Sequence, residues 1–361
     1  MEEKKILIIA GEPSGDLHGS NLVKSLKKEK NIKFFGIGGE KLKKEGVEIL
    51  GNINKIAVMG FFEVIKKLPY IYFIFNKVLK KVKREKPNLA ILIDYPGFNF
   101  ILMKKLYKMN IPVVYYICPQ VWAWKPERVY KLKKYTIKRL VIFPFEEEFF
   151  KNFGVEANYV GHPLLDSIKI EDSKNSKKVK IGIFPGSRKA EIKYLLSHIF
   201  EVLSFLKEKI ENVEFYIKIY EPIKHFILNK LKKYNLNLKV LKEEIIRLDF
   251  SIMSSGTVTL ENALAGNPGI VLYKLNPLTY KLFKNKINTK YISIVNILLN
   301  EMVYEEFLQE KIDVENIKNY VLNLIFDKDK LNEKKEKLSK LKDILKYGAV
   351  ENAKREILNL L

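Results

Sequence analysis

Small polar residues and one glycine lie between a short apolar run and a helical pattern in the second half of the chain. Residues 250–253 are apolar and predict a buried strand, and apolar side chains at helical spacing follow. The turn between them contains Ser255, Gly256 and Thr257. Free backbone N–H groups at the start of a helix favour a phosphate, whereas Glu261, one turn further on, suits ribose hydroxyls. A capped helix with solvated side chains would have the same pattern, so the turn alone leaves both interpretations open.

A second group of polar residues follows the first expected strand, residues 6–10. Its loop is rich in glycine and precedes a helical pattern, which places it at the carboxyl end of a strand, where α/β proteins bind ligands. The candidate groups for binding a sugar or moving a proton are Glu12, Asp16 and His18. Ser14 or Asp16 would also serve as a helix cap. The loop lacks the G-x-G-x-x-G spacing, which argues against a dinucleotide.

Asp94 directly follows another expected strand, residues 89–93. A carboxylate at the carboxyl end of a central strand is a plausible general base, but Asp94 is equally suited to capping a helix at residues 100–107. Both tryptophans of the chain, Trp122 and Trp124, follow the next strand and lie beside basic residues. This combination suits contact with a sugar or a phosphate, although tryptophans also pack in cores.

The pattern of strands and helices begins again after a polar segment at residues 171–178, which is the best linker in the chain. An expected strand at residues 179–184 leads into a glycine-containing loop with Arg188, whose guanidinium suits bidentate contacts with phosphate oxygens. After a last strand at residues 270–273 the pattern is helical, apart from a short interruption at residues 291–296. Two βα halves of about equal length predict an α/β protein with two doubly wound parallel sheets facing a cleft.

The composition limits the class of protein and its surroundings. The chain has 361 residues, 47% of them hydrophobic, and a formal net charge of +23, so two domains and anionic partners are expected. The charge also reflects a chain rich in lysine throughout. The single cysteine, Cys118, excludes a disulfide framework, and no spacing of His, Cys, Asp or Glu indicates a metal site. No apolar run is long enough for a signal peptide or a membrane span, so we expect a cytoplasmic protein.

Residues 61–81 carry more aromatic side chains than a surface helix needs, with lysines beside and among them. This mixture is typical of a helix that lies in the plane of an anionic membrane. Pro69 is expected to break the segment into two helices, so that it does not span the membrane. Two core helices with outward lysines are the alternative, but so many large apolar groups would crowd one face, which favours the membrane.

Several motifs together closely resemble the lipid-A-disaccharide synthase family, from about residue 5 to the C-terminus. They are AGEPSGD at residues 10–16, IDYPGFN at 93–99, PQVWAW at 119–124, PGSR at 185–188 and SSGTVTLE at 254–261. The resemblance implies a GT-B fold and an inverting transfer without a metal or another cofactor. It implies UDP-2,3-diacylglucosamine as donor and 2,3-diacylglucosamine 1-phosphate as acceptor, with the tetraacyl disaccharide 1-phosphate and UDP as products.

The resemblance also assigns roles to residues of this chain. Asp94 is implied as the general base that takes the proton from the acceptor hydroxyl. For substrate binding the resemblance implies Arg188, Ser255, Gly256, Thr257, Glu261 and Asn296, and we add Glu12, Ser14 and Asp16 from the loop after the first strand as expected substrate-binding residues. Within this set, the backbone of the 255–257 turn and Arg188 hold the diphosphate, and Glu261 binds the ribose.

Gly97 departs from the family pattern, because some members have a second aspartate there. Asp94 is therefore the only carboxylate in its loop and lacks a possible supporting charge. If Asp94 is not the base, Glu12, Asp16 or His18 could take the role. His18 ranks last, because it is not reliably present in relatives.

These assignments divide the chain into three parts. Residues 1–170 are expected to bind the acceptor and dock on the membrane, residues 171–340 to bind the UDP-sugar, and residues 341–361 to form a helix that packs on the N-terminal domain or on a partner subunit. We expect an enzyme peripheral to the inner face of the inner membrane, with a possible homodimer and no nucleic-acid partner. The alternative is an enzyme like a UDP-N-acetylglucosamine epimerase that acts on a soluble sugar and does not need residues 61–81.

Overall fold

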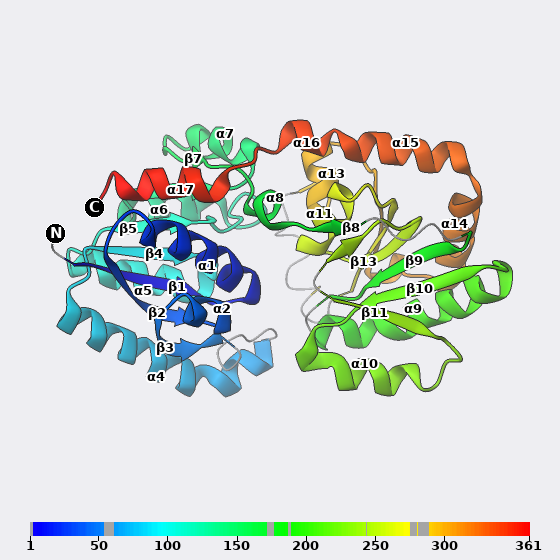
Figure 1. Cartoon of the computed structure of the whole chain (residues 1–361), viewed down its shortest axis with the longest axis horizontal. Helices are drawn as coiled ribbons and strands as arrows, with labels where there is room; N and C mark the ends of the chain where they lie inside the picture. The colour runs from blue at the N-terminus through cyan, green and yellow to red at the C-terminus, as the bar shows by residue number, and fades with distance from the viewer. Residues whose placement is uncertain are drawn as a thin grey trace. The chain divides into compact units, whose positions relative to one another are not determined.

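Parallel strands alternate with helices along both halves of the chain in the computed structural model (Figure 1). The structure describes residues 3–53, 61–171, 177–186, 189–242, 244–274, 280 and 289–361. The chain divides into a first unit, residues 1–166 with 345–361, and a second unit, residues 167–344.

The first unit contains one sheet of seven strands, and all the pairs are parallel. In the order in which they hydrogen-bond, the strands are β3 (Glu48–Asn52), β2 (Ile32–Gly38), β1 (Lys4–Ala10), β4 (Leu89–Ile93), β5 (Val113–Tyr116), β6 (Lys138–Val141) and β7 (Asn158–Tyr159). The strand order reverses between β1 and β4, where Ala10 pairs with Ile93. Ligands of doubly wound sheets bind beyond the carboxyl ends of the strands at this switch point. The loops that contain Glu12 and Asp94 follow these two strands.

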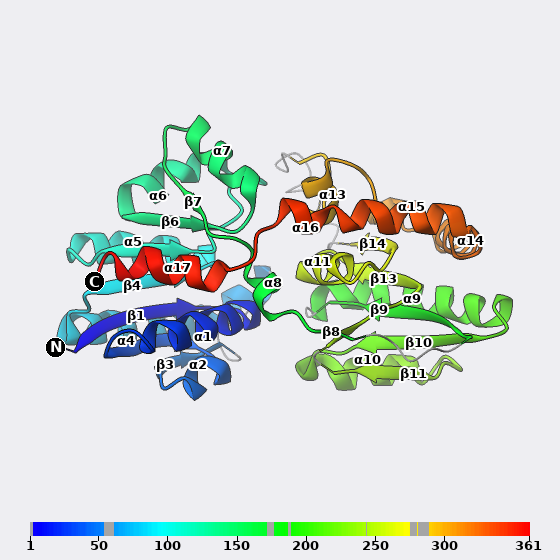
Figure 2. The same ribbon diagram turned by 45° about the horizontal axis from the view of Figure 1, so that its top comes forward.

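Alternate side chains of the strands in the first unit pack into two separate cores. Ile6 and Ile8 of β1 face one core, whereas Leu7 and Ile9 face the other. The first core is covered by α1 (Pro13–Lys27), α2 (Glu40–Lys44) and α17 (Ala349–Leu358), and the second by α4 (Phe61–Glu85), α5 (Pro96–Lys108), α6 (Val129–Tyr135) and α7 (Pro144–Asn152). The unit also contains the short helices η1 (Pro126–Arg128) and α8 (Pro163–Ser167). The C-terminal helix α17 lies against α1 (Figure 2). Burial on both faces explains why the central strands are almost continuously apolar.

Helix α4 continues through Pro69, so the expected break into two helices is wrong. Proline removes one backbone hydrogen bond from a helix and costs free energy in its interior. Pro69 lies on the exposed side, where water can bind the carbonyl that loses its partner. On the opposite side, Ile74, Val78 and Val82 are buried in the core. Their packing holds the helix together across the proline.

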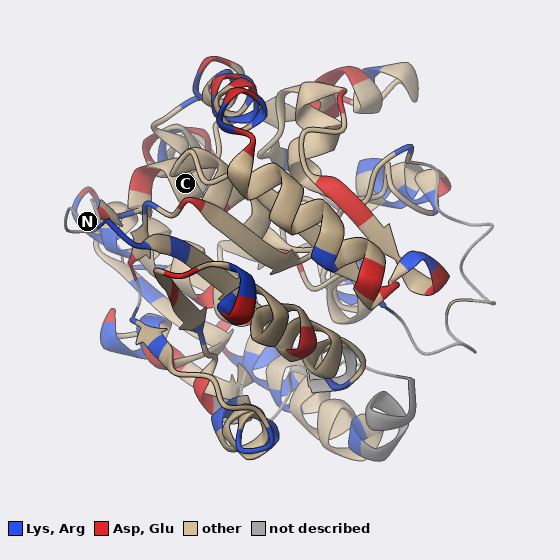
Figure 3. Cartoon of the chain, turned by 90° about the vertical axis from the view of Figure 1, so that its right-hand side faces the viewer, with Lys and Arg blue, Asp and Glu red and all other residues tan. Residues whose placement is uncertain are grey.

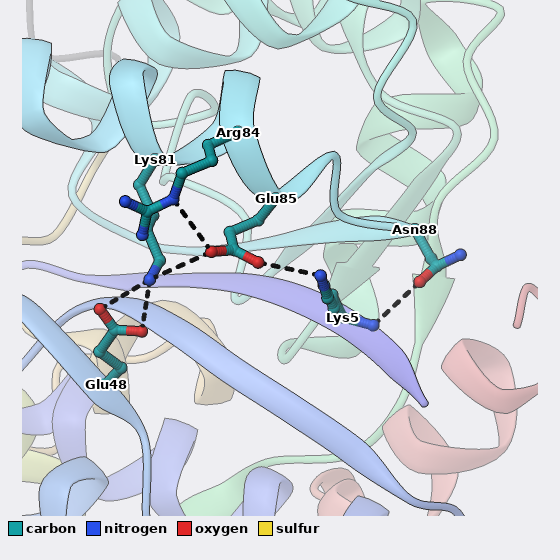
Figure 4. A network of polar contacts seen from close by, with 6 residues as sticks. All are labelled: Lys5, Glu48, Lys81, Arg84, Glu85 and Asn88. Carbon is teal, nitrogen blue, oxygen red and sulfur yellow. Dashed lines mark hydrogen bonds and ion pairs between the residues drawn. The ribbon is translucent and has the colours of Figure 1, made fainter. Parts of the chain in front are cut away.

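An ion-pair network fastens the C-terminal end of α4 to β1 and β3 (Figure 4). Its members are Lys5, Glu48, Lys81, Arg84, Glu85 and Asn88. Lys5 Nζ lies 2.9 Å from Glu85 Oε2, and Lys81 Nζ lies 2.7 Å from Glu48 Oε2. The hydrogen bond from Lys5 is the main reason why the pKa of Glu85 is lowered to about 2. Single exposed pairs add little stability, so the network chiefly fixes where the helix lies.

The second unit contains a parallel sheet of six strands. In their hydrogen-bonded order they are β11 (Leu238–Leu241), β10 (Val213–Lys218), β9 (Val179–Phe184), β13 (Phe250–Ser254), β14 (Gly269–Tyr273) and β15 (Glu305–Leu308). The order reverses between β9 and β13, where Phe184 pairs with Met253. The helices are η2 (Glu221–Ile223), η4 (Gln309–Lys311), α9 (Lys189–Lys209), α10 (Lys224–Leu231), α11 (Thr257–Leu264), α13 (Ile294–Leu299), α14 (Val314–Phe326), α15 (Lys328–Ser339) and α16 (Leu341–Ile344). A separate pair of short strands joins β8 (Ile170–Glu171) to β12 (Ile245–Ile246).

Strand β15 corrects the expectation that only helices follow residue 273. The sequence around it does not form an apolar run, because Glu305 and Glu306 lie in the strand. Glu306 is nevertheless buried, since its carboxylate accepts hydrogen bonds from the backbone N–H groups of Ile292 and Ser293. A buried carboxylate is tolerated when donors surround it, and no pattern local to residues 305–308 reveals those donors.

Charged residues lie mainly on helices and loops, where basic and acidic side chains are interspersed (Figure 3). In the part of the chain that the structure describes, no helix is both long and apolar enough to cross a membrane. Within the same residues, no group of three or more His, Cys, Asp or Glu side chains could hold a metal ion.

Candidate functional site

The turn after β4 holds Asp94 in a strained backbone conformation. Asp94 and Tyr95 have φ angles of 41° and 48°. Two consecutive non-glycine residues in the left-handed region cost free energy, and such strain concentrates at functional sites. Asn99 Nδ2 donates a hydrogen bond of 2.8 Å to the carbonyl oxygen of Asp94, and Tyr115 Oη donates one of 2.6 Å to the same atom. Because Asn99 and Tyr115 are fully buried, they fix the turn and the half-buried Asp94 in place.

Tyr95 connects this turn to the loop after β1. A Cβ atom on Gly11 would lie 2.1 Å from Tyr95 Cγ, so only glycine leaves room for the ring. Burial, with a smaller effect from the charge of Glu12, raises the pKa of Tyr95 to about 12. The structure therefore brings the loops of Glu12 and Asp94 together at the switch point.

Asp16 holds a neighbouring turn instead of facing solvent. Its side chain is 4% exposed and accepts hydrogen bonds from the backbone N–H groups of Gly39 (2.6 Å), Lys41 (3.0 Å) and Leu42 (3.2 Å). These bonds satisfy free donors at the start of α2. Asp16 thus positions the β2–α2 turn, whereas Ser14 is exposed in the first turn of α1.

His18 and His162 are both buried in the first unit, so neither is exposed as a general base would be. Burial lowers the pKa of His18 to about 4 and that of His162 to about 3, and the two rings are close enough to influence each other. His162 Nδ1 accepts a hydrogen bond of 3.2 Å from the backbone N–H of Leu164. Both histidines are therefore neutral in the folded protein near pH 7.

We expect His162→Asn to flatten the acid side of the stability profile, because asparagine Oδ1 can accept the Leu164 hydrogen bond but does not titrate. The wild-type pKa is about 3 when folded and 6.5 in the reference state, so unfolding takes up a proton as the pH falls below 6.5. The contribution that neutral His162 makes to the free energy of unfolding is therefore complete above pH 6.5 and decreases as the pH falls below that value. Urea unfolding between about pH 6 and pH 4 should give a slope smaller by about 1.4 kcal/mol per pH unit in the variant. Glu146, whose pKa is raised, contributes to this slope with the opposite sign, but its contribution is the same in the wild type and in the variant. Equal slopes in the two proteins would therefore contradict the prediction.

Glu146 is a buried carboxylate that sequence reasoning missed. It is 1% exposed and accepts hydrogen bonds from Trp122 Nε1 (2.9 Å), Ile142 N (3.1 Å) and Phe143 N (3.0 Å). Burial raises its pKa to about 7 against the effect of these bonds, and the charge of Asp94 adds to the rise. Trp122 is thus anchored inside the first unit. The available signal was the position of Glu146 at the third residue of α7, which is typical of a capping box.

In the second unit, two glycine-containing turns meet at the switch point. Gly186 has a φ of 94°, and a Cβ atom there would lie 2.5 Å from Ser254 Oγ. Gly256 precedes α11 without a side-chain cap, is exposed, and would place a Cβ atom in open space. The backbone donors at the start of α11 are therefore accessible to an anion. Ser255 Oγ donates to Ile292 O over 3.3 Å, Thr257 is exposed, and Arg188 lies outside the described residues.

Glu261 has a basic partner that the sequence did not indicate. Lys218 Nζ, at the carboxyl end of β10, lies 2.8 Å from Glu261 Oε2, and both side chains remain partly exposed. Asn296, by contrast, is fully buried, and its amide bonds to both backbone groups of Tyr304 and to Glu306 Oε1. Lys218 therefore joins the site, and Asn296 supports the segment around it.

The two doubly wound parallel sheets, each with a ligand-ready turn at its switch point, form a fold of the GT-B type. The glycotransferase of kitacinnamycin has this fold, with a TM-score of 0.63, 11% identity and coverage of 100% of both chains. So does the UDP-GlcNAc 2-epimerase from Neisseria meningitidis bound to UDP-GlcNAc, with a TM-score of 0.55, 12% identity and coverage of 99% of both chains. Because glycosyltransferases and UDP-GlcNAc 2-epimerases share this fold, the fold alone does not show to which of the two classes the chain belongs.

The sequence comparisons make that choice. The family model for lipid-A-disaccharide synthetase matches residues 6–360. The lipid-A-disaccharide synthase of Trichlorobacter lovleyi is 35% identical over 363 residues, covering 96% of this chain and 95% of that protein. The chain belongs to the lipid-A-disaccharide synthase family and is a glycosyltransferase, and the epimerase alternative has support from the fold alone.

Proposed function

We propose that the enzyme transfers a diacylglucosamine unit from UDP-2,3-diacylglucosamine to 2,3-diacylglucosamine 1-phosphate, with inversion at the anomeric carbon and release of UDP. The observation that carries the proposal is the family match over residues 6–360. The first unit binds the acceptor, and the second binds the UDP-sugar. A homodimer remains a prediction from the sequence.

In the proposed reaction Asp94 is the general base. Its carboxylate takes the proton from the attacking acceptor hydroxyl, which forms the new bond from the face opposite UDP as the bond to the diphosphate breaks. The fixed turn supports this role, because a base contributes most when its position is set before the reaction. Glu12, on the adjoining loop, and Ser14, in the first turn of α1, are proposed to bind the sugar.

The leaving diphosphate needs positive charge where its own charge develops. The accessible N–H groups at the start of α11, from Ser255, Gly256 and Thr257, are proposed to supply it together with Arg188. Glu261 is proposed to accept hydrogen bonds from the ribose. Asp16 and Asn296 do not contact the substrates in this proposal, because their polar atoms already bind neighbouring backbone. They position the segments that do.

Product analysis tests the proposed function. The purified enzyme in uncharged detergent should convert the two proposed substrates into a disaccharide 1-phosphate with the summed acyl chains, measured by mass spectrometry. Proton NMR of the new linkage should show the configuration opposite to that of the donor. Epimerisation of soluble UDP-N-acetylglucosamine without disaccharide formation would contradict the proposal.

We also propose that α4 docks the enzyme on the inner face of the inner membrane. Leu68, Tyr72 and Phe73 are 50%, 69% and 61% exposed on the side of α4 opposite the core. Large apolar side chains exposed next to lysines are costly in water but stable at an anionic lipid surface. This surface would keep the enzyme beside its acylated substrates.

We expect the double variant Tyr72→Ser and Phe73→Ser to bind anionic lipid vesicles about 10-fold more weakly, because two aromatic groups no longer enter the interface. Vesicle flotation measures this, and thermal unfolding should stay unchanged since both side chains are exposed. Phe326→Ser is the matched control, because Phe326 is 62% exposed on α14 in the second unit. An equal loss in the control, or none in the double variant, would contradict docking through α4.

A further inference from the structure

The loop between β5 and α6 starts beside the backbone of Asp94 and carries two basic residues around one tryptophan. The backbone N–H of Asp94 donates a hydrogen bond of 3.2 Å to Ile117 O, at the beginning of this loop. Trp124 lies further along the loop and is partly exposed, whereas the indole of its neighbour Trp122 donates a hydrogen bond to Glu146. Residues 124–128 of this loop have no role in the proposed transfer as described above.

Arg128 packs its guanidinium against two aromatic rings. Its Cζ atom lies 4.9 Å from the ring centroid of Trp124 and 5.0 Å from that of Phe100. Rings that cover a guanidinium restrict its motion and leave the N–H donors along its edge, which is the geometry for bidentate contact with oxyanions. Among the residues that the structure describes, the Arg128 side chain has no hydrogen bond and no carboxylate partner. Arg128 is half-buried, so its charge is less screened than that of an exposed arginine.

Lys125 brings a second positive charge to the same ring. Its Nζ atom lies 4.9 Å from the Trp124 centroid, and its backbone φ of 58° lies in the strained left-handed region. The only acidic side chain between the two cations is Glu127, which is exposed and forms no ion pair with either of them in the described structure. The segment therefore keeps a net positive charge over an aromatic surface.

We propose that Arg128, supported by Lys125, binds the phosphomonoester of the acceptor and so selects a phosphorylated sugar. The inference rests on the proposed function and adds a site to it. The donor brings a diphosphate, for which the second unit has its own turns. The acceptor brings a phosphomonoester, and a half-buried arginine with an unused edge is the group best suited to recognise it. The phosphate of a membrane phospholipid is the other possible source of the same chemistry.

The test measures how strongly the enzyme prefers an acceptor that carries the phosphate. Transfer to 2,3-diacylglucosamine 1-phosphate and to 2,3-diacylglucosamine is compared in uncharged detergent micelles. We expect wild-type kcat/KM to be about 10- to 100-fold higher with the phosphate, the usual effect of a charge-assisted hydrogen-bonded pair. Arg128→Met should lower this preference to about 3-fold or less, without changing transfer to the unphosphorylated acceptor. Arg128→Lys should give an intermediate preference, because it keeps the charge but loses the fork.

Controls separate this role from folding and from membrane binding. UDP affinity of Arg128→Met should equal that of the wild type, which checks that the protein is folded. Arg84→Met is the matched control, since Arg84 is an exposed arginine of the same unit, and its preference should stay at the wild-type value. Binding of Arg128→Met to anionic vesicles should also be unchanged.

An unchanged acceptor preference in Arg128→Met, or an equal loss with both acceptors, would overturn the proposal. Weaker vesicle binding with the preference retained would assign Arg128 to phospholipid headgroups and overturn it as well. If the wild type transferred to neither acceptor, the proposed function itself would fail, and this inference would fail with it.

Discussion

Asp94→Asn should lower kcat by about 100- to 10,000-fold while leaving UDP affinity and thermal stability close to those of the wild type. Asparagine has almost the same shape as aspartate but cannot take a proton, and a general base contributes a factor of this size. The contacts that hold the turn involve the backbone of residue 94, because Asn99 and Tyr115 both bind its carbonyl oxygen. The substitution therefore removes the base and keeps the turn.

Two further variants make this result specific to Asp94. Glu12→Gln removes the neighbouring carboxylate that is the other candidate base, and we expect a smaller loss that appears mainly in KM. Glu148→Gln removes an exposed carboxylate of α7 in the same unit and should have no effect. Near-normal turnover in Asp94→Asn would contradict the assignment of Asp94 as the base. A larger loss in Glu12→Gln than in Asp94→Asn would assign that role to Glu12.

Lys218→Met should weaken UDP binding by about 10- to 30-fold. In the wild type the ammonium group lies 2.8 Å from the carboxylate of Glu261, one turn into α11. Without this partner, an uncompensated negative charge would lie near the proposed diphosphate site, where repulsion acts across a partly exposed surface. Uridine, which has no phosphate, should lose less affinity than UDP.

A double-mutant cycle tests this explanation. Adding Glu261→Gln to Lys218→Met should restore part of the UDP affinity, because it removes the repelling charge. Lys239→Met is the matched control, since Lys239 of β11 forms a 2.9 Å pair with Glu214 of β10, the strand that also carries Lys218, and should not affect binding. Isothermal titration with UDP measures the wild type, the Lys218→Met and Glu261→Gln single variants, the double variant and Lys239→Met. Equal losses in Lys218→Met and Lys239→Met would show that the Lys218 pair has no particular connection with the nucleotide.

The fold was predictable where strands are buried on both faces. Residues 6–10, 89–93, 179–184 and 250–253 are mainly apolar, and each forms a strand next to a switch point. Strand β15 was not predictable, because Glu306 is buried by donors from residues 292–296 that no local pattern reveals. The break predicted at Pro69 was wrong for a related reason. The packing of the buried side of α4 against the core outweighs the one hydrogen bond that the proline removes.

The candidate site shows the same limit at the level of single residues. The strand-and-turn pattern correctly located the loops of Asp94 and Gly256 at the carboxyl ends of central strands. The roles of Asp16 and Asn296 depend on partners that only the folded chain supplies, such as the N–H of Gly39 for Asp16. Lys218 gave no signal, because a lysine at the end of a strand is common and its partner is 43 residues away.

The central claim is tested most directly by measuring UDP release from UDP-2,3-diacylglucosamine, with and without 2,3-diacylglucosamine 1-phosphate, in detergent and with a chelator present. We predict release that depends on the acceptor and is unaffected by the chelator. Release without the acceptor, or only from UDP-N-acetylglucosamine, would contradict the proposed transfer and favour a hydrolase or an epimerase.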